Sequence, residues 1–271
     1  MKKFLRIAGF VILYHLIIIG ACNLVVMGWL TFIPKDFAYR NFVIADCLGF
    51  LLTLLIYGLI FKFRKKSLIK TMNFRRLSFK NFLIVLTVGI LMGVFTCLVC
   101  NTPPVLKNMP VFENYLKNLM DYATSFPLFL LVVGICFAFE EMIFRGAIMG
   151  EIRTGAALYP TIFISVALYG LMNCFMMGWL IGIYAVVASL FYTLGYVWQR
   201  SLWASITFQV ASIYVIATFR KTGIFKWLST LNGAVLFSAI IVVAVIIAIF
   251  YYNMYKNFQK PGVAENATVS A

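Results

Sequence analysis

The chain has 271 residues, of which 63% are hydrophobic and only 11% are charged. A typical soluble domain is nearer half apolar and a quarter charged, and a fold of this size in water has no means of hiding so much apolar surface. The composition therefore excludes a soluble enzyme, a soluble nucleic-acid-binding domain and a disordered regulator. It predicts an all-α, polytopic integral membrane protein with one membrane domain over residues 1–271.

The net charge of +15 is carried by 23 Lys and Arg residues against 8 Asp and Glu residues. In a soluble protein such a surplus would suggest nucleic acid as a partner. Here the cations gather in loops between apolar stretches, where they set topology and contact anionic head groups. We therefore expect membrane lipids, and not nucleic acid, among the partners of this chain.

Apolar stretches long enough to cross a bilayer, which takes about 20 residues, recur along the whole chain. The eight candidate spans, in chain order, are residues 7–33, 42–61, 82–100, 127–145, 157–173, 175–197, 202–219 and 232–252. Two pairs of small residues, Gly146/Gly150 and Gly178/Gly182, have the four-residue spacing that lets membrane helices approach closely. The sequence thus predicts a bundle of about eight transmembrane helices.

The orientation follows from the loop between the second and third spans. Residues 62–80 hold eight Lys or Arg residues and no acidic residue, which favours the cytoplasmic side. An even number of spans then places both termini in the cytoplasm of a multi-pass protein of the cell membrane. Arg220, Lys221 and Lys226 would lie outside in this orientation, against the same rule.

The six cysteines lie in or at the ends of apolar stretches, where they are typical of small buried residues rather than of a disulfide framework. Cys97 and Cys100 form a CxxC pair, but no second Cys or His pair follows at the spacing that a metal site needs. We expect no metal and no cofactor.

Two adjacent carboxylates lie inside the fourth candidate span, in the sequence FAFEEMIFRG over residues 137–146. A charge at bilayer depth is costly, so residues of this kind are functional candidates by default. Glu141 and Arg145 have the i, i+4 spacing of an ion pair on a helix. Glu140 projects about 100° away from Glu141 and would face the bundle interior as a general base. The alternative is an ion network that only fixes helix packing.

EExxxR followed by Gly, here at residues 140–146, resembles the first motif of the CAAX-protease and bacteriocin-processing (CPBP, or Abi) family of intramembrane glutamate proteases. ALYGLMN at residues 167–173 is similar to the second motif, FxxxH. SLWASI at residues 201–206 is similar to the run that leads into the third motif, HxxxN. The resemblance covers residues 125–215 and implies an eight-helix endopeptidase that cleaves membrane-associated peptides or proteins with a glutamate-activated water.

Carried onto this chain, the resemblance assigns catalytic roles within the first motif. Glu140 occupies the position of the base, and Glu141 and Arg145 occupy the positions that organise the site. The only histidine of the chain, His15, lies in the first span and outside all three motifs, so we expect it to be a packing residue. Asp46, near one end of the second span, is a weaker candidate for the same site.

The second and third motifs depart from the family pattern at three positions. Asn173 and Gln209 replace the two histidines that assist the water, and Ile213 replaces the asparagine that stabilises the oxyanion. An amide cannot exchange a proton near neutral pH. An isoleucine offers no donor to an oxyanion, and the loss of one such donor typically costs about 10²–10³ in rate. These departures predict impaired proteolysis.

Three classes of function remain open on the sequence. The retained glutamates favour an active intramembrane protease. The absent histidines favour a non-catalytic, protease-derived binding or regulatory protein, as in family members linked to bacteriocin immunity or to a sensor kinase. A proton-coupled transporter with a glutamate relay ranks last, because the sequence shows no inverted repeat and no broken-helix signal in both halves.

Overall fold

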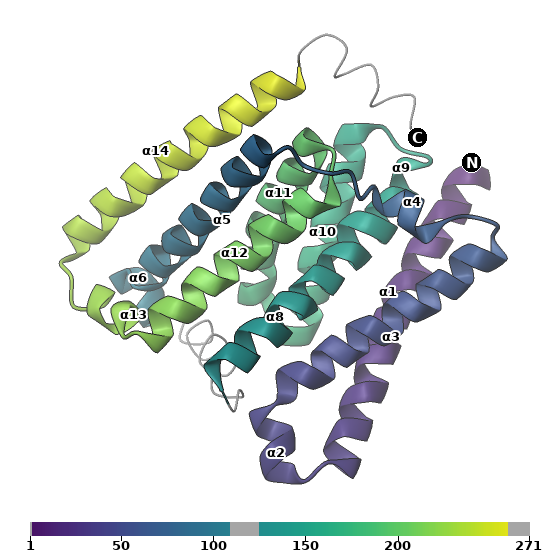
Figure 1. Cartoon of the computed structure of the whole chain (residues 1–271), viewed down its shortest axis with the longest axis horizontal. Helices are drawn as coiled ribbons and strands as arrows, with labels where there is room; N and C mark the ends of the chain where they lie inside the picture. The colour runs from purple at the N-terminus through teal and green to yellow at the C-terminus, as the bar shows by residue number, and fades with distance from the viewer. Residues whose placement is uncertain (1, 109–124, 260–271) are drawn as a thin grey trace. The chain divides into compact units, whose positions relative to one another are not determined.

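The computed structural model describes residues 2–108 and 125–259, and the regular elements in these ranges are all helices (Figure 1). Eight of the helical segments in the described ranges are long and apolar enough to cross a membrane. The polytopic helical fold is therefore confirmed, and the chain is a multi-pass membrane protein. These segments are Leu5–Phe32, Phe42–Phe63, Phe79–Cys100, Phe126–Arg153, Leu158–Phe175, Trp179–Gln199, Leu202–Lys221 and Gly233–Phe258. The C-terminal tail from residue 260, predicted to be cytoplasmic, lies outside the described residues.

The described residues form two compact units, each made of two parts of the chain. The first unit contains residues 2–75 and 125–194. Its helices are α1 (Lys2–Phe32), α2 (Lys35–Arg40), α3 (Phe42–Phe63), α4 (Leu68–Met72), α8 (Phe126–Glu141), η1 (Met142–Ile148), α9 (Met149–Arg153), α10 (Leu158–Met177) and most of α11 (Trp179–Gln199).

Within the first unit, α1 and α3 pack along one another and are joined at one end by the short helix α2 (Figure 1). Gly49 of α3 permits this approach, because a Cβ atom there would lie only 3.0 Å from Sγ of Cys22 in α1. Helix α8 packs on α3. The unit therefore brings the first, second and fourth spans together, although the chain separates the fourth span from the other two.

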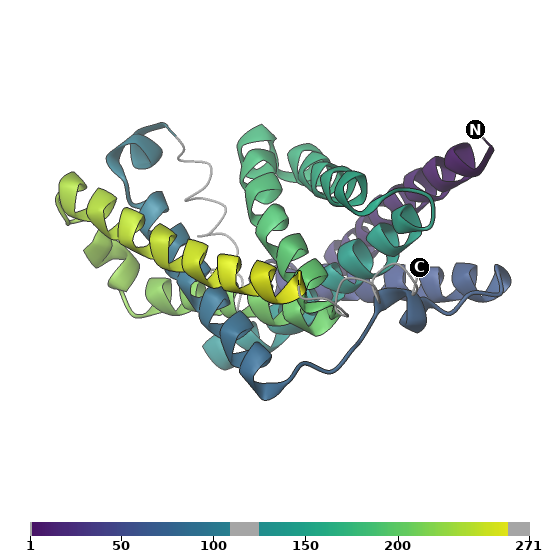
Figure 2. The ribbon, with the colours of Figure 1, turned by 90° about the horizontal axis from the view of Figure 1, so that it is seen from above.

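The second unit contains residues 76–108 and 195–259 of the described chain. Its helices are α5 (Phe79–Cys100), α6 (Pro103–Asn108), the end of α11, α12 (Leu202–Lys221), α13 (Ile224–Leu228) and α14 (Gly233–Phe258). Helix α5 packs against both α12 and α14 (Figure 2). Two glycines of α5, Gly89 and Gly93, allow α12 to approach closely. A Cβ atom at residue 89 would lie 2.7 Å from the Phe208 carbonyl oxygen, and a Cβ atom at residue 93 would lie 2.6 Å from the Ser212 carbonyl oxygen.

The fourth span is longer than the sequence predicted. It begins at Phe126, with the hydroxyl of Ser125 accepting a hydrogen bond from the backbone of Leu128, and this agrees with the predicted start. It continues through Arg153 instead of ending near residue 145. The prediction stopped at the charges, whereas the structure buries Glu151 against Arg64 of the α3–α4 turn. The ion pair allows the helix to run past its charged residues.

The predicted pairs of small residues are only partly correct. Gly178 lies between α10 and α11 at φ 95°, a left-handed conformation that favours glycine, so it does not pair with Gly182 on one helix face. Gly182 does mark a close approach, but to α10: its Cβ position would lie 2.7 Å from Cβ of Cys174 and 3.0 Å from the carbonyl oxygen of Gly170. Gly150 packs on Thr71 of α4 and not on another span.

Candidate functional site

The predicted ion pair inside the fourth span is present. Nη1 of Arg145 lies 2.8 Å from Oε1 of Glu141, at the expected i, i+4 spacing. The Glu141 side chain is 0% exposed and that of Arg145 is 1% exposed. Both charges are therefore removed from solvent, and each depends on the other for compensation.

The helix changes its winding between the two charges. Helix α8 ends at Glu141, and residues Met142–Ile148 form the π-helix η1 before α9 resumes the α-helical turn. Every residue of η1 from Ile143 to Ile148 is buried. Short π-helical turns inside α-helices occur often at functional sites. The sequence shows no local signal for this change, because η1 contains no proline and its single glycine fits an α-helix as well.

Glu140 occupies a different environment from its neighbour, as the 100° offset predicts. Its side chain is 6% exposed, and Oε1 accepts a hydrogen bond of 3.0 Å from the hydroxyl of Tyr169 in α10. Tyr169 stands at the aromatic position of the second motif, where the family pattern has Phe. The extra hydroxyl of Tyr is the sequence signal that could have identified this contact.

Arg145 also connects α11 to the site. Its Nη2 donates to Oγ of Ser189 at 2.8 Å and lies 3.5 Å from the Ser189 carbonyl oxygen. Its guanidinium carbon lies 4.6 Å from the ring centroid of Tyr169 and 5.7 Å from that of Tyr192. One buried cation thus holds residues from η1, α10 and α11 together. Ser189 and Tyr192 lie in none of the three motifs, so sequence reasoning missed both residues.

The three departures from the family pattern fall in different units. Asn173 lies in α10 of the first unit, 8% exposed, and its Nδ2 donates to the Tyr169 carbonyl oxygen at 3.0 Å. Gln209 and Ile213 lie on α12 of the second unit, the first buried and the second half-buried. The first unit therefore contains Glu140, the Glu141–Arg145 pair and Asn173, and the catalytic roles of all these residues remain predictions.

Two weaker candidates also lie in the first unit. Asp46 lies in α3, which packs on α8, the helix that ends with Glu140 and Glu141. The rings of His15 and of Phe144 in η1 form a T-shaped contact with their centroids 6.0 Å apart, and Nδ1 of His15 is 2.7 Å from the Val11 carbonyl oxygen. This position agrees with a packing role for the histidine.

Metal ligands do not converge anywhere in residues 2–108 and 125–259. No group of three or more His, Cys, Asp or Glu side chains in these ranges has an arrangement that could hold a metal ion. All six cysteines are free thiols. The side chains that the structure brings together at the site are buried carboxylates, an arginine and hydroxyl groups.

Comparison with known families identifies the region that holds this site. Residues 122–215 match the family model described as Rce1-like, type II CAAX prenyl endopeptidase Rce1-like. The match supports the expected resemblance to the CPBP family over this part of the chain, which we call the CPBP region. The CPBP region begins just before α8 and includes η1, α10, α11 and most of α12, and it agrees closely with the predicted range of 125–215. No curated protein and no solved structure matches the chain.

The hydroxyl of Tyr169 provides a direct test of the site geometry. We expect Tyr169→Phe to lower the free energy of unfolding by about 1.5–3 kcal/mol, because a buried carboxylate loses a hydrogen-bond donor while the ring contact with Arg145 is kept. The measurement is reversible denaturation of the purified protein in mixed micelles. Tyr159→Phe, at an exposed position of the same helix, is the matched control, and equal losses for both variants would contradict the contact.

Proposed function

We propose that this chain is a CAAX-protease-like membrane protein that binds a membrane-associated peptide or protein at the Glu140 site and cleaves it slowly or not at all. The orientation with both termini in the cytoplasm of the cell is part of this proposal. The observation that carries the proposal is the difference between the first motif of the CPBP region and its later motifs. Its first motif is intact and buried, whereas the histidine positions of the later motifs hold amides.

The buried first motif supports a role for Glu140 in hydrolysis. For peptide cleavage, Glu140 would remove a proton from water while the water oxygen attacks the peptide carbonyl carbon. The proton would then pass to the leaving amine nitrogen as the carbon–nitrogen bond breaks. The Glu141–Arg145 pair occupies a separate set of contacts, so Glu140 does not have to neutralise the arginine.

The later motifs limit the rate of that reaction. The Asn173 amide group donates to the backbone of its own helix at 3.0 Å, and an amide does not transfer protons near neutral pH. Gln209 has the same limitation, and Ile213 supplies no hydrogen bond to an oxyanion. A site that keeps its base but lacks proton carriers can still bind a substrate, but it cleaves that substrate slowly.

The substrate class follows from the family match and from the membrane setting. The matched family is described as prenyl endopeptidases, and the eight apolar helices keep the chain within the bilayer. We infer a ligand that reaches the site from the membrane, which is either a lipid-modified peptide or a segment of another membrane protein.

The test compares binding with cleavage in one preparation of the full chain. Purified protein is incubated with fluorescent peptides that end in a prenylated CaaX sequence and with matched unprenylated peptides. We expect binding by anisotropy, and cleavage close to that of the Glu140→Gln variant. Tyr159→Phe serves as the control for handling. Rapid cleavage that depends on Glu140 would overturn the impaired-protease proposal, and the absence of binding to every peptide would overturn the proposed ligand class.

A further inference from the structure

The segment of residues 62–70 holds the densest group of cations in the described part of the first unit. It holds five cations, of which Lys62, Lys65, Lys66 and Lys70 are exposed. Glu151 is the only carboxylate that forms an ion pair with the segment in the described part of the chain. One buried carboxylate cannot balance five cations, so the segment keeps a large positive excess.

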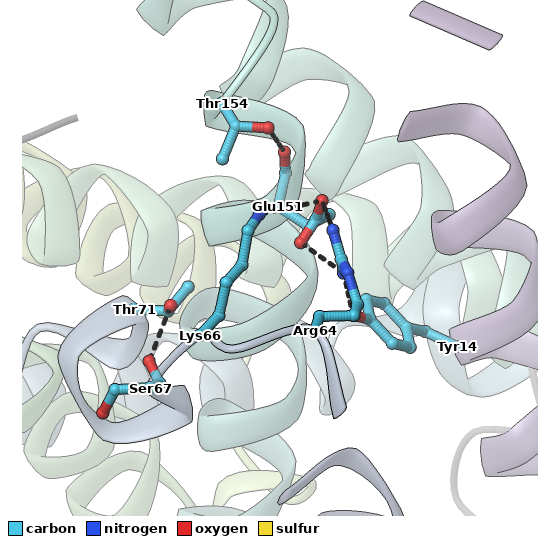
Figure 3. Close-up of polar contacts among 7 residues, drawn as sticks. All are labelled: Tyr14, Arg64, Lys66, Ser67, Thr71, Glu151 and Thr154. Atoms are coloured by element: carbon cyan, nitrogen blue, oxygen red, sulfur yellow. Dashed lines mark hydrogen bonds and ion pairs between the residues drawn. The ribbon is translucent and has the colours of Figure 1, made fainter. Parts of the chain in front are cut away.

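The carboxylate of Glu151 already forms ion pairs with two of these cations (Figure 3). Arg64 binds its carboxylate with both terminal nitrogens, at 2.7 and 3.0 Å, and Nζ of Lys66 lies 3.6 Å away. Arg64 also donates to the hydroxyl of Tyr14 in α1 at 2.9 Å. Partial burial works against its charge, but the hydrogen bonds and charge of Glu151 outweigh this effect and raise the pKa of Arg64 above its ordinary value. Lys62, Lys65 and Lys70 have no ion pair with any described residue.

The backbone of the segment is held in a defined conformation. Helix α3 ends in a reverse turn in which the Lys66 N–H donates to the Phe61 carbonyl oxygen at 2.9 Å and the Lys65 N–H donates to that of Lys62 at 3.0 Å. Lys65 occupies the left-handed position of this turn, at φ 55°, where glycine is usual. Ser67 then caps α4, because its hydroxyl accepts from the Lys70 N–H at 3.3 Å. The lysines therefore project from fixed positions.

Helix α4 is also held in place by its packing on α9 and η1. Thr71 packs so closely on Gly150 of α9 that a Cβ atom at residue 150 would lie 2.5 Å from Cγ2 of Thr71. The side chain of Met72 is 1% exposed. Because α4 contacts η1 and α9, the segment packs on the part of the fourth span that follows Glu141.

The depth of the segment follows from the length of α3. A helix of 22 residues rises about 33 Å, enough to cross a hydrocarbon core of about 30 Å. If α3 crosses this core, residues 64–70 lie at the level of the lipid head groups. Two apolar side chains, Phe63 at 85% exposed and Ile69 at 70% exposed, accompany the lysines. Exposed apolar side chains among lysines at this depth are typical of a segment that lies in the membrane interface.

We propose that the 62–70 segment binds the phosphate of an anionic phospholipid, with Lys65 and Lys70 as its principal contacts. The lipid supplies the negative charge that the protein lacks here, and its acyl chains cover Phe63 and Ile69. A free phosphate ion would satisfy the lysines but would make no contact with either apolar side chain, whereas a phospholipid contacts both kinds of side chain, so the geometry favours the lipid. This interaction goes beyond the proposed peptide site and does not require cleavage.

The test measures lipids that stay bound to the purified full chain by native mass spectrometry, after exchange into detergent with phosphatidylglycerol or phosphatidylcholine. Each lysine near an anionic surface contributes about fivefold in affinity, so K65Q/K70Q is expected to hold phosphatidylglycerol about 25-fold more weakly. Binding of phosphatidylcholine should be unchanged. K221Q/K226Q removes the same charge from two exposed lysines of the second unit and should behave as the unmodified chain.

Three results would overturn this proposal. The first is equal retention of phosphatidylglycerol by K65Q/K70Q and the unmodified chain. The second is an equal loss in the K221Q/K226Q control. The third is displacement of the lipid by millimolar inorganic phosphate, which would make this a site for a free anion. Helicity measured by circular dichroism on every variant separates a lost lipid contact from a lost fold.

Discussion

Arg145→Ala is expected to lower the free energy of unfolding by about 3–5 kcal/mol, which is the typical cost of leaving one partner of a buried ion pair alone. Glu141, at 0% exposed, would lose the cation that lies 2.8 Å from its carboxylate. Ser189 would lose its donor, and the ring of Tyr169 its contact with the guanidinium. Denaturation in mixed micelles, followed by helicity, measures the effect.

Two further variants separate the ion pair from other causes of instability. Glu140→Gln keeps the shape of the side chain and the acceptor for the Tyr169 hydroxyl, so its loss should be much smaller. Glu141→Gln combined with Arg145→Leu removes both charges and should cost less than Arg145→Ala alone, because no unpaired charge remains. If the double variant is instead the least stable of the three, the pair is not what stabilises this region.

Restoring the family pattern should increase proteolysis by at least about 100-fold. The variant combines Asn173→His, Gln209→His and Ile213→Asn, which together supply two proton carriers and one donor to an oxyanion. General acid–base groups contribute about 10²–10⁴ in rate, and one oxyanion donor about 10²–10³. The measurement is the initial rate of peptide cleavage, compared with that of the unmodified chain under the same conditions.

Each single replacement is expected to change this rate little, since residues that act as one catalytic unit are strongly non-additive. Adding Glu140→Gln to the triple variant is the control, and it should remove the gained activity. Robust cleavage by the unmodified chain would contradict the premise, because it would mean that the amides, or His15, already provide what the reaction needs. A triple variant that folds and remains inactive would equally count against the assignment of these positions.

The sequence predicted the helical spans well because each span needs only an apolar stretch of sufficient length. Seven of the eight spans begin within about four residues of their predicted starts and end within about six of their predicted ends, as expected when backbone polarity in lipid forces a helix. The fourth span was predicted too short. A charged residue such as Glu151 suggests the end of a membrane segment. Its ion-pair partner, Arg64, lies 87 residues earlier in the chain, so local sequence does not reveal the pair.

The site was predictable only where its contacts lie within one helix. The i, i+4 rule identified the pairing of Glu141 with Arg145, and the 100° offset predicted a separate environment for Glu140. The π-helix between α8 and α9 was not predictable from residues 142–148, because its winding depends on packing around a segment that is buried on all sides.

The amino-acid sequence alone was enough to identify a multi-pass membrane protein, the residues of its first motif and the family pattern that they resemble. These conclusions rest on composition and on local spacing, both of which are properties of consecutive residues. Three contacts became visible only in the packed helices: the hydrogen bond from Tyr169 to Glu140, the hydrogen bond from Arg145 to Ser189, and the ion pair of Glu151 with Arg64. Each of these contacts joins side chains at least 29 positions apart, and a buried polar group takes its partner from whichever helix packs beside it.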